Sequence, residues 1–263
     1  MIMEKKIFFF DIDGTIYHEQ KITDRVIKAI HDIQKQGHYC FIASGRPYTF
    51  IPQVLKDVGF DGFILANGAY VFINDHIISH EVLDYHDLNR LLQYLRDTHN
   101  EYILQTKDTC YLKKEYTKIY NFFKSIGMRV HEFIEDFDED EIMKDVIKIE
   151  VWPNSREEGE EIKKNLVNFS WHQYENLNIE LYSNKVSKAS GVDKIIKLLN
   201  INLKNTYAFG DGRNDFEMFD MVEHSYAMAN APLEVQERAK YVCPSVTEDG
   251  VAVILEEIFK CND

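Results

Sequence analysis

Positive charge is scarce in this chain. Its 263 residues include 30 Lys and Arg against 44 Asp and Glu, which gives a formal net charge of −14 at pH 7. Sequence-independent affinity for nucleic acid comes from Lys and Arg that displace counterions from phosphates, and the chain has no long basic run. We therefore expect no nucleic-acid partner. An acidic protein that handles an anionic ligand needs a local positive patch or a bound cation, because its overall field repels the ligand.

Long apolar runs are also missing. The stretch "IFFF" at residues 7–10 is cut by Asp11, so it is too short for the apolar part of a signal peptide or for a membrane span. The cysteines show no CxxC pair and no spacing typical of a metal site. They are Cys40, Cys110, Cys243 and Cys261. We therefore expect a reduced, cytoplasmic protein with no membrane partner.

The segments that are present alternate strands and helices over the first 66 residues. The hydrophobic share of 45% is enough for an ordinary globular core. We expect strands at 7–10, 39–44 and 62–66, a helix at 23–37 that begins after Thr23 and ends before Gly37, and a helix at 48–59 interrupted near Pro52. This βαβαβ order predicts a parallel sheet with right-handed crossovers.

The pattern then changes and later returns. Residues 69–83 are typical of a hairpin with its turn at Asn74 and Asp75, and residues 83–184 mix strands and helices in an α+β order. From residue 190 onward the βα alternation resumes. We therefore predict an α/β fold with a doubly wound, Rossmann-like parallel sheet formed by residues 1–82 and 185–263, and an inserted α+β domain at 83–184.

The inserted domain contains an acidic stretch, "EDFDEDE" at 135–141. Three aspartates at alternate positions resemble the start of an EF-hand loop, but the glycine that such a loop needs is replaced by Glu141. We expect a solvated loop here.

Three polar clusters follow predicted strands of the parallel sheet. They are "DIDGT" at 11–15, "SGRP" at 44–47 and "GDGRND" at 210–215. In open parallel sheets, ligands bind beyond the carboxyl ends of the strands, so these clusters are expected to converge on one site.

Carboxylates dominate that expected site. The four are Asp11, Asp13, Asp211 and Asp215. Brought together without compensation, they would repel one another and raise each other's pKa. Mg²⁺ is the cation that suits them, because it prefers oxygen ligands and is usually held by one or two carboxylates together with substrate phosphate.

The other residues of the three clusters are suited to binding phosphate. Short donors, glycines that let backbone N–H groups approach closely, and one guanidinium are all present. The donors and the cation are Thr15, Ser44, Asn214 and Arg46, and the glycines are Gly14, Gly45 and Gly212. A GxxxxGK[ST] loop is absent from the sequence, which argues against nucleotide cleavage of the P-loop kind.

Four motifs in order resemble the haloacid dehalogenase superfamily of phosphohydrolases, in particular its Cof-type sugar-phosphatase branch. They are "DIDGT", "SGRP", the lysine of "VSKASGV" at 186–192, and "GDGRND". Further similarities are "ANGA" at 66–69, "AMANA" at 227–231 and "EDGVA" at 248–252. The inserted domain resembles the α/β cap of this branch, which sets substrate specificity.

The resemblance implies roles for individual residues. Asp11 matches the nucleophile that forms an aspartyl-phosphate, and Asp13 matches the general acid and base. Lys188 matches the lysine that neutralises charge on nucleophile and phosphate, with Lys185 as a rival in the same motif. The implied magnesium ligands are Asp11, the backbone carbonyl of Asp13 and Asp211, with Asp215 as a further ligand or a support. The implied phosphate contacts are Thr15, Ser44, Gly45, Arg46, Lys188 and Asn214.

The activity implied by the resemblance is a Mg²⁺-dependent phosphatase. Its substrates would be small phosphorylated metabolites, either sugar phosphates or phosphorylated cofactors, and the protein would be a monomer or a weak homodimer. Two alternatives stay open: a phosphomutase of the same superfamily, and a module that senses a phosphorylated metabolite without turning it over. The physiological ester and the cap residues that select it are not identified by these motifs.

Overall fold

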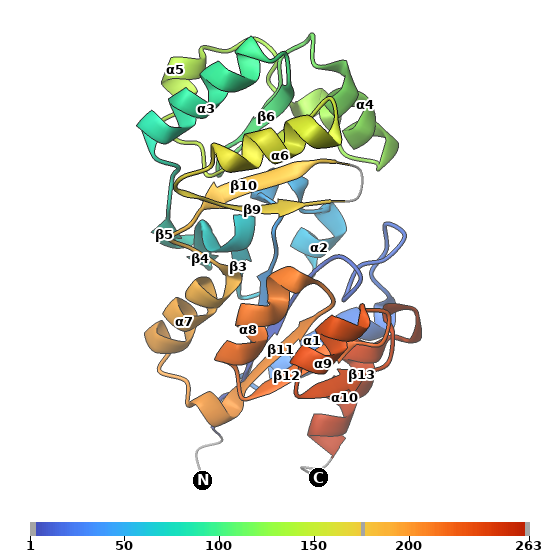
Figure 1. The fold of residues 1–263 in the computed structure, drawn as a ribbon. Helices are drawn as coiled ribbons and strands as arrows, with labels where there is room; N and C mark the ends of the chain where they lie inside the picture. Colours follow the sequence, from blue (N-terminus) through green and yellow to red (C-terminus); the bar gives the residue numbers. More distant parts are fainter. Residues whose placement is uncertain (1–3, 175–176, 261–263) are drawn as a thin grey trace. The chain divides into compact units, whose positions relative to one another are not determined.

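The computed structural model describes residues 4–174 and 177–260 and divides into two compact units (Figure 1). The first comprises Met1–Gly45, Ile51–Ser79 and Ser187–Asp263, and the second comprises Arg46–Phe50 and His80–Val186. Both mix helices with strands, and the α/β fold class predicted from the sequence is confirmed. The interpretation of the two units as a catalytic core and a cap stays a prediction.

An eight-stranded sheet runs through the described part of the first unit, in the order β13-β12-β11-β1-β2-β3-β4-β5. Pairings from β13 to β3 are parallel, and β4 runs antiparallel to β3. The strands are β1 Ile7–Phe10, β2 Tyr39–Ala43, β3 Gly62–Leu65, β4 Tyr70–Ile73, β5 His76–His80, β11 Thr206–Gly210, β12 His224–Met228 and β13 Tyr241–Cys243. The central position of β1 explains why its four residues are fully buried.

Helices cover both faces of this sheet. They are α1 Asp24–Lys35, α2 Gln53–Asp57, α7 Lys188–Leu198, α8 Phe216–Met221, α9 Leu233–Arg238 and α10 Gly250–Lys260. Phe9 of β1 shares a hydrophobic cluster with Val192 of α7 and Met218 of α8. Phe8, which points to the other face, contacts Phe259 of α10 with ring centroids 6.1 Å apart. The doubly wound arrangement expected from the βα alternation is therefore present. Thr23 caps α1 as predicted, since its hydroxyl accepts a hydrogen bond from the Val26 N–H at 3.3 Å.

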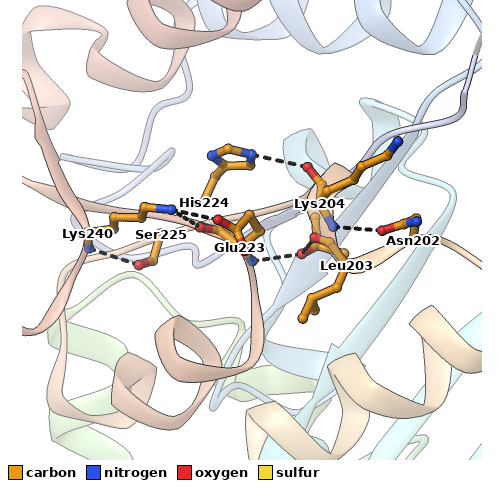
Figure 2. A network of polar contacts seen from close by, with 8 residues as sticks. Asn202, Leu203, Lys204, Glu223, His224, Ser225 and Lys240 are labelled. Atoms are coloured by element: carbon orange, nitrogen blue, oxygen red, sulfur yellow. Dashed lines mark hydrogen bonds and ion pairs between the residues drawn. The ribbon is translucent and has the colours of Figure 1, made fainter.

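The amino ends of β11, β12 and β13 are tied together by polar contacts (Figure 2). The ammonium of Lys240 donates to the carbonyl of Glu223 at 3.2 Å and to its carboxylate at 2.7 Å, and the Lys240 N–H donates to the hydroxyl of Ser225 at 3.0 Å. The His224 ring contacts the carbonyl oxygen of Lys204 at 3.1 Å. This network fixes one end of the strands, while the polar clusters of the sequence lie at the other.

The second unit is built on an antiparallel five-stranded sheet among its described residues, in the order β7-β6-β8-β10-β9. Its strands are β6 Glu101–Gln105, β7 Cys110–Tyr111, β8 Lys148–Trp152, β9 Phe169–Gln173 and β10 Ile179–Ser183, and its helices are α3 Tyr85–Asp97, α4 Thr117–Ser125, α5 Glu139–Ile142 and α6 Arg156–Lys164. Leu92 of α3 and Ile162 of α6 pack with Ile149 of β8 in one buried cluster. None of the helices among the described residues of the chain is long and apolar enough to cross a membrane.

The acidic stretch at 135–141 corrects one expectation. Part of it forms the short helix α5 instead of a loop, because the Asp138 side chain accepts a hydrogen bond from the Asp140 N–H at 2.9 Å and so caps the first turn. These aspartates form no metal-ligand group among the described residues.

A short segment that follows β2 belongs to the second unit. Phe50 is 5% exposed, and its ring centroid lies 4.9 Å from that of Phe123 and 5.7 Å from that of Phe133. The guanidinium of Arg46 donates to the carbonyl of Phe50 at 2.7 Å. The chain therefore passes between the units after Gly45, Phe50, Ser79 and Val186.

We expect Phe50→Ala to destabilise the second unit by about 3–5 kcal/mol, because it leaves a cavity among aromatic rings. The chain has two tryptophans, Trp152 and Trp171, and both lie in this unit, so tryptophan fluorescence during urea unfolding reports on it directly. The control is Val167→Ala, because Val167 is 65% exposed and lies in the same unit. Equal urea midpoints for the two variants would show that Phe50 does not anchor the segment.

Candidate active site

The pairing of β1 with β11 brings Asp11 and Asp211 together. Phe10 at the end of β1 pairs with Phe209 of β11, and the Asp11 N–H donates to the Phe209 carbonyl at 2.9 Å. Asp11 follows Phe10 directly and Asp211 follows Phe209 after Gly210, so both aspartates lie at the carboxyl ends of neighbouring parallel strands. Together with Asp215 they each offer a carboxylate oxygen, and these oxygens lie within 4.8 Å of one another.

The turn after Asp11 depends on a glycine. Gly14 has a φ of +72°, and a Cβ placed there would lie 2.0 Å from an Asp211 carboxylate oxygen. Only glycine lets the turn pass so close to Asp211. The turn leaves Asp13 exposed while Asp11 is 7% exposed, so the two carboxylates predicted to share the chemistry occupy different environments.

A buried lysine pairs with this group. Lys188 is the first residue of α7, whose start is fixed by a capping box between Ser187 and Ser190. Its ammonium lies 2.6 Å from Asp11 Oδ1 and 2.7 Å from Asp215 Oδ1. Burial opposes its charge, but the two carboxylates outweigh burial and raise the pKa of Lys188. This lysine therefore stays protonated at neutral pH.

The rival lysine has a different environment. Lys185 belongs to the second unit, its side chain is 72% exposed, and its ammonium lies 3.4 Å from a carboxylate oxygen of Glu81. The contact with Asp11 is made by Lys188, which is the alternative that the motif register favours.

Both oxygens of Asp215 are occupied by protein donors. Oδ1 accepts from Lys188, and Oδ2 accepts from the N–H groups of Asp211 at 3.1 Å and Gly212 at 3.0 Å. Asp215 is fully buried. This geometry favours a supporting role, in which Asp215 orients Lys188 and the loop that carries Asp211.

The electrostatics of the group favour a cation. Burial, together with Asp215, raises the pKa of Asp211 to about 7. Burial also raises the pKa of Asp11 well above its usual range, although Lys188 opposes this. Among the described residues, Asp211 has no Lys or Arg partner, and its hard carboxylate oxygens match the ligands that Mg²⁺ prefers. The residues present therefore fit a divalent cation. The carbonyl of Asp13 as a further ligand stays a prediction.

The predicted phosphate contacts have mixed positions. Thr15 and Ser44 are buried, and within the described part of the chain the hydroxyl of Thr15 has no hydrogen-bond partner, which suits a ligand contact. Asn214 is exposed at the end of the loop that carries Asp211. Arg46 belongs to the second unit, and its role as an anion contact stays a prediction.

One residue next to these contacts was not predicted. Asn67, in the turn after β3, is 2% exposed, and its Oδ1 accepts from Asn214 Nδ2 at 3.5 Å. The sequence singled out "ANGA" only as a resemblance. The backbone conformation that brings Asn67 to this place could not be inferred from that motif.

Comparisons with known proteins identify the family of this chain. The sequence profile described as haloacid dehalogenase-like hydrolase matches residues 8–255. The chain belongs to the haloacid dehalogenase-like hydrolases. "Putative phosphatase YkrA" of Bacillus subtilis (strain 168) is 31% identical over 257 residues, which cover 97% of this chain and 98% of that protein. The predicted family is therefore confirmed.

Two further relatives of this hydrolase carry more specific names. "5-amino-6-(5-phospho-D-ribitylamino)uracil phosphatase YcsE" of Bacillus subtilis (strain 168) is 27% identical, with 94% of this chain and 93% of that protein covered. The structure of the haloacid dehalogenase subclass IIB sugar phosphatase BT4131 superposes with a TM-score of 0.83 at 25% identity, covering 97% of this chain and 99% of that one. Phosphatase is thus the activity named among its relatives, and the match extends over both units.

The raised pKa of Asp211 predicts how this hydrolase responds to pH and Mg²⁺. Between the unfolded value near 4 and the folded value of about 7, the folded state binds more protons than the unfolded state, so stability falls as pH rises. A cation bound only by the folded state restores it. We expect the thermal midpoint to rise more with Mg²⁺ at about pH 8 than at about pH 5. Differential scanning fluorimetry with Mg²⁺ or EDTA measures this, and Asp211→Asn is the control that should lose the response. An equal rise at both pH values would contradict a cation on Asp211.

Proposed function

We propose that this hydrolase is a Mg²⁺-dependent phosphatase that cleaves small phosphorylated metabolites through an aspartyl-phosphate on Asp11. The observation that carries the proposal is the buried Asp11 carboxylate at the end of β1, with the Lys188 ammonium 2.6 Å away and Asp211 beside it. A nucleophile, a fixed positive charge and a cation site thus lie together at the carboxyl ends of parallel strands.

The residues divide the reaction into two displacements. In the first, an Asp11 oxygen attacks phosphorus, the bond from phosphorus to the ester oxygen breaks, and Asp13 gives its proton to the leaving alcohol. In the second, Asp13 takes a proton from water, the water oxygen attacks phosphorus, and Asp11 leaves as a carboxylate with release of inorganic phosphate. The exposure of Asp13 supports this role, because its proton can exchange with solvent.

Lys188 keeps Asp11 available as a nucleophile. Burial alone favours a protonated Asp11, and the Lys188 charge opposes this by stabilising the carboxylate. When bound, Mg²⁺ would supply positive charge for the phosphoryl oxygens at Asp11 and Asp211. Ser44 and Asn214 would orient those oxygens by hydrogen bonds.

The substrate class is proposed from the relatives. The name of BT4131 specifies a sugar phosphate, and that of YcsE specifies a phosphorylated ribitylamino compound. Both names denote a phosphate on a hydroxyl-bearing carbon chain. We therefore propose sugar phosphates, or phosphorylated cofactor precursors with such a chain, as substrates of this protein.

Phosphate release from a panel of phosphorylated metabolites, with Mg²⁺ and with EDTA, tests the proposal. We expect release that requires Mg²⁺ and is fastest with sugar or polyol phosphates. Isomerised sugar phosphate without free phosphate would instead identify a phosphomutase. Tight binding of an ester with no release would identify a sensing module, and either outcome would overturn the proposed hydrolysis.

A further inference from the structure

The turn after β3 has an unusual backbone. Ala66, Asn67 and Gly68 follow one another with φ values of +48°, +54° and +95°. Residues other than glycine rarely adopt positive φ, because it is unfavourable for them, and they keep it only where the surrounding structure compensates for the cost. All three residues are buried, with Asn67 2% exposed. A strained and buried turn beside a proposed active site calls for a function.

The turn contacts the residue that precedes Lys188. A Cβ placed on Gly68 would lie 2.2 Å from the carbonyl oxygen of Ser187, the N-cap of α7. The backbone of the turn therefore packs directly against the start of the helix that begins with Lys188. No side chain larger than hydrogen fits at Gly68, which fixes the distance between turn and helix.

Asn67 also contacts the loop after β2. Its N–H donates to the carbonyl of Ser44 at 3.1 Å. A Cβ placed on Gly45 would lie 3.1 Å from Asn67 Oδ1 and 3.5 Å from its Nδ2, so the Asn67 amide lies close against Gly45. Two predicted phosphate contacts, Ser44 and Gly45, are thus held by one side chain and its backbone.

The same amide reaches the loop after β11. Asn214 Nδ2 donates to Asn67 Oδ1 at 3.5 Å, which is the outer limit for such a bond and is expected to shorten when a ligand holds Asn214. An amide nitrogen carries two protons. One is directed at Asn67, and this leaves the second for an oxygen of the ligand.

We propose that Asn67 is a positioning residue that orients Asn214 and the Ser44–Gly45 turn around the transferring phosphate group. The inference rests on the proposed function and adds to it a residue to which the motifs gave no role. Asparagine suits the position for two reasons. It tolerates positive φ better than most residues, and its neutral amide accepts from Asn214 without placing a negative charge near the phosphate.

Glycine isolates the role of the side chain. Asn67→Gly keeps the backbone conformation and removes the amide. The matched control is Asn200→Gly, because Asn200 also has a positive φ, +50°, but is exposed at the end of α7. Isothermal titration calorimetry with inorganic phosphate and Mg²⁺ gives the dissociation constant, and p-nitrophenyl phosphate gives kcat and KM. We expect phosphate binding and kcat/KM of Asn67→Gly to fall roughly ten- to a hundredfold, with the control unchanged.

A double-mutant cycle separates positioning from general stability. If Asn67 acts through Asn214, then Asn67→Gly in an Asn214→Ala background should weaken phosphate binding much less than it does alone. Asn67→Asp keeps the acceptor and the backbone preference, and we expect it to fold but to bind phosphate more weakly than wild type, because its carboxylate repels the anion.

The outcomes distinguish this inference from the proposed function. If the wild type binds and releases phosphate but Asn67→Gly behaves like Asn200→Gly, or if the effects of Asn67→Gly and Asn214→Ala add fully, the positioning role is wrong and the proposed function stands. If the wild type neither binds phosphate nor hydrolyses any ester, the proposed function fails and the inference fails with it.

Discussion

Replacing Asp11 with asparagine should abolish turnover while leaving the protein as stable as the wild type or more stable. The amide has the shape of the carboxylate but is a poor nucleophile, so no aspartyl-phosphate forms. For residues that act in a covalent step, such single changes typically reduce kcat by about 10⁴-fold or more. We expect a loss of this size in Mg²⁺-dependent phosphate release from Asp11→Asn.

The expected stability follows from the charge of the site. When ionised, Asp11, Asp211 and Asp215 carry three negative charges against the single positive charge of Lys188. Burial disfavours the charge of Asp11, as its raised pKa shows. Asparagine removes one of the repelling charges and still offers an oxygen to Lys188. A site that is strained for function is commonly stabilised by removing the group that functions.

Thermal midpoints and phosphate release on the same preparations test both parts. Asp24→Asn is the matched control, since Asp24 is exposed in the first turn of α1. Near wild-type release by Asp11→Asn would refute the nucleophile assignment. Lost release together with a large fall in the thermal midpoint would show instead that Asp11 is needed for folding.

The position of the carboxylates could be predicted because it depends on local patterns. Four apolar residues in a row indicated a strand buried on both faces, and a carboxylate directly after it must lie at the carboxyl end of that strand. The same logic placed Asp211 after β11. That β1 and β11 are neighbours required only the topology of a doubly wound sheet.

Other features could not be predicted, because they are very short or because they depend on contacts between distant segments, which no periodicity encodes. Strand β13 at Tyr241–Cys243 is too short for an alternation of residues to stand out, and it was not predicted. The anchoring of Phe50 in the second unit depends on Phe123 and Phe133, far away in the sequence. Asn67 was missed for the same reason, since its contacts with Ser44 and Asn214 come from two other loops.

Lys188→Met should have the second large effect, and on stability as well as on turnover. The change leaves Asp11 and Asp215 buried without their counter-charge, and removing one partner of such a pair typically costs about 3–5 kcal/mol. Loss of a positive group that faces developing charge typically reduces kcat by about 10²–10³-fold. We expect both effects, with the stability measured by urea unfolding and the turnover by Mg²⁺-dependent phosphate release.

The pH dependence of that loss identifies its cause. Below pH 7 Asp211 takes up a proton, so the carboxylates repel each other less. The loss in free energy of unfolding caused by Lys188→Met should therefore be larger at about pH 8 than at about pH 5. Lys185→Met is the matched control. Its ammonium is exposed and pairs with Glu81, a surface contact worth at most about 1 kcal/mol, so turnover and stability should stay near wild type. If Lys185→Met instead lost turnover while Lys188→Met kept it, the motif register would be displaced by three residues, and the buried lysine beside Asp11 would be a structural counter-ion with no part in the reaction.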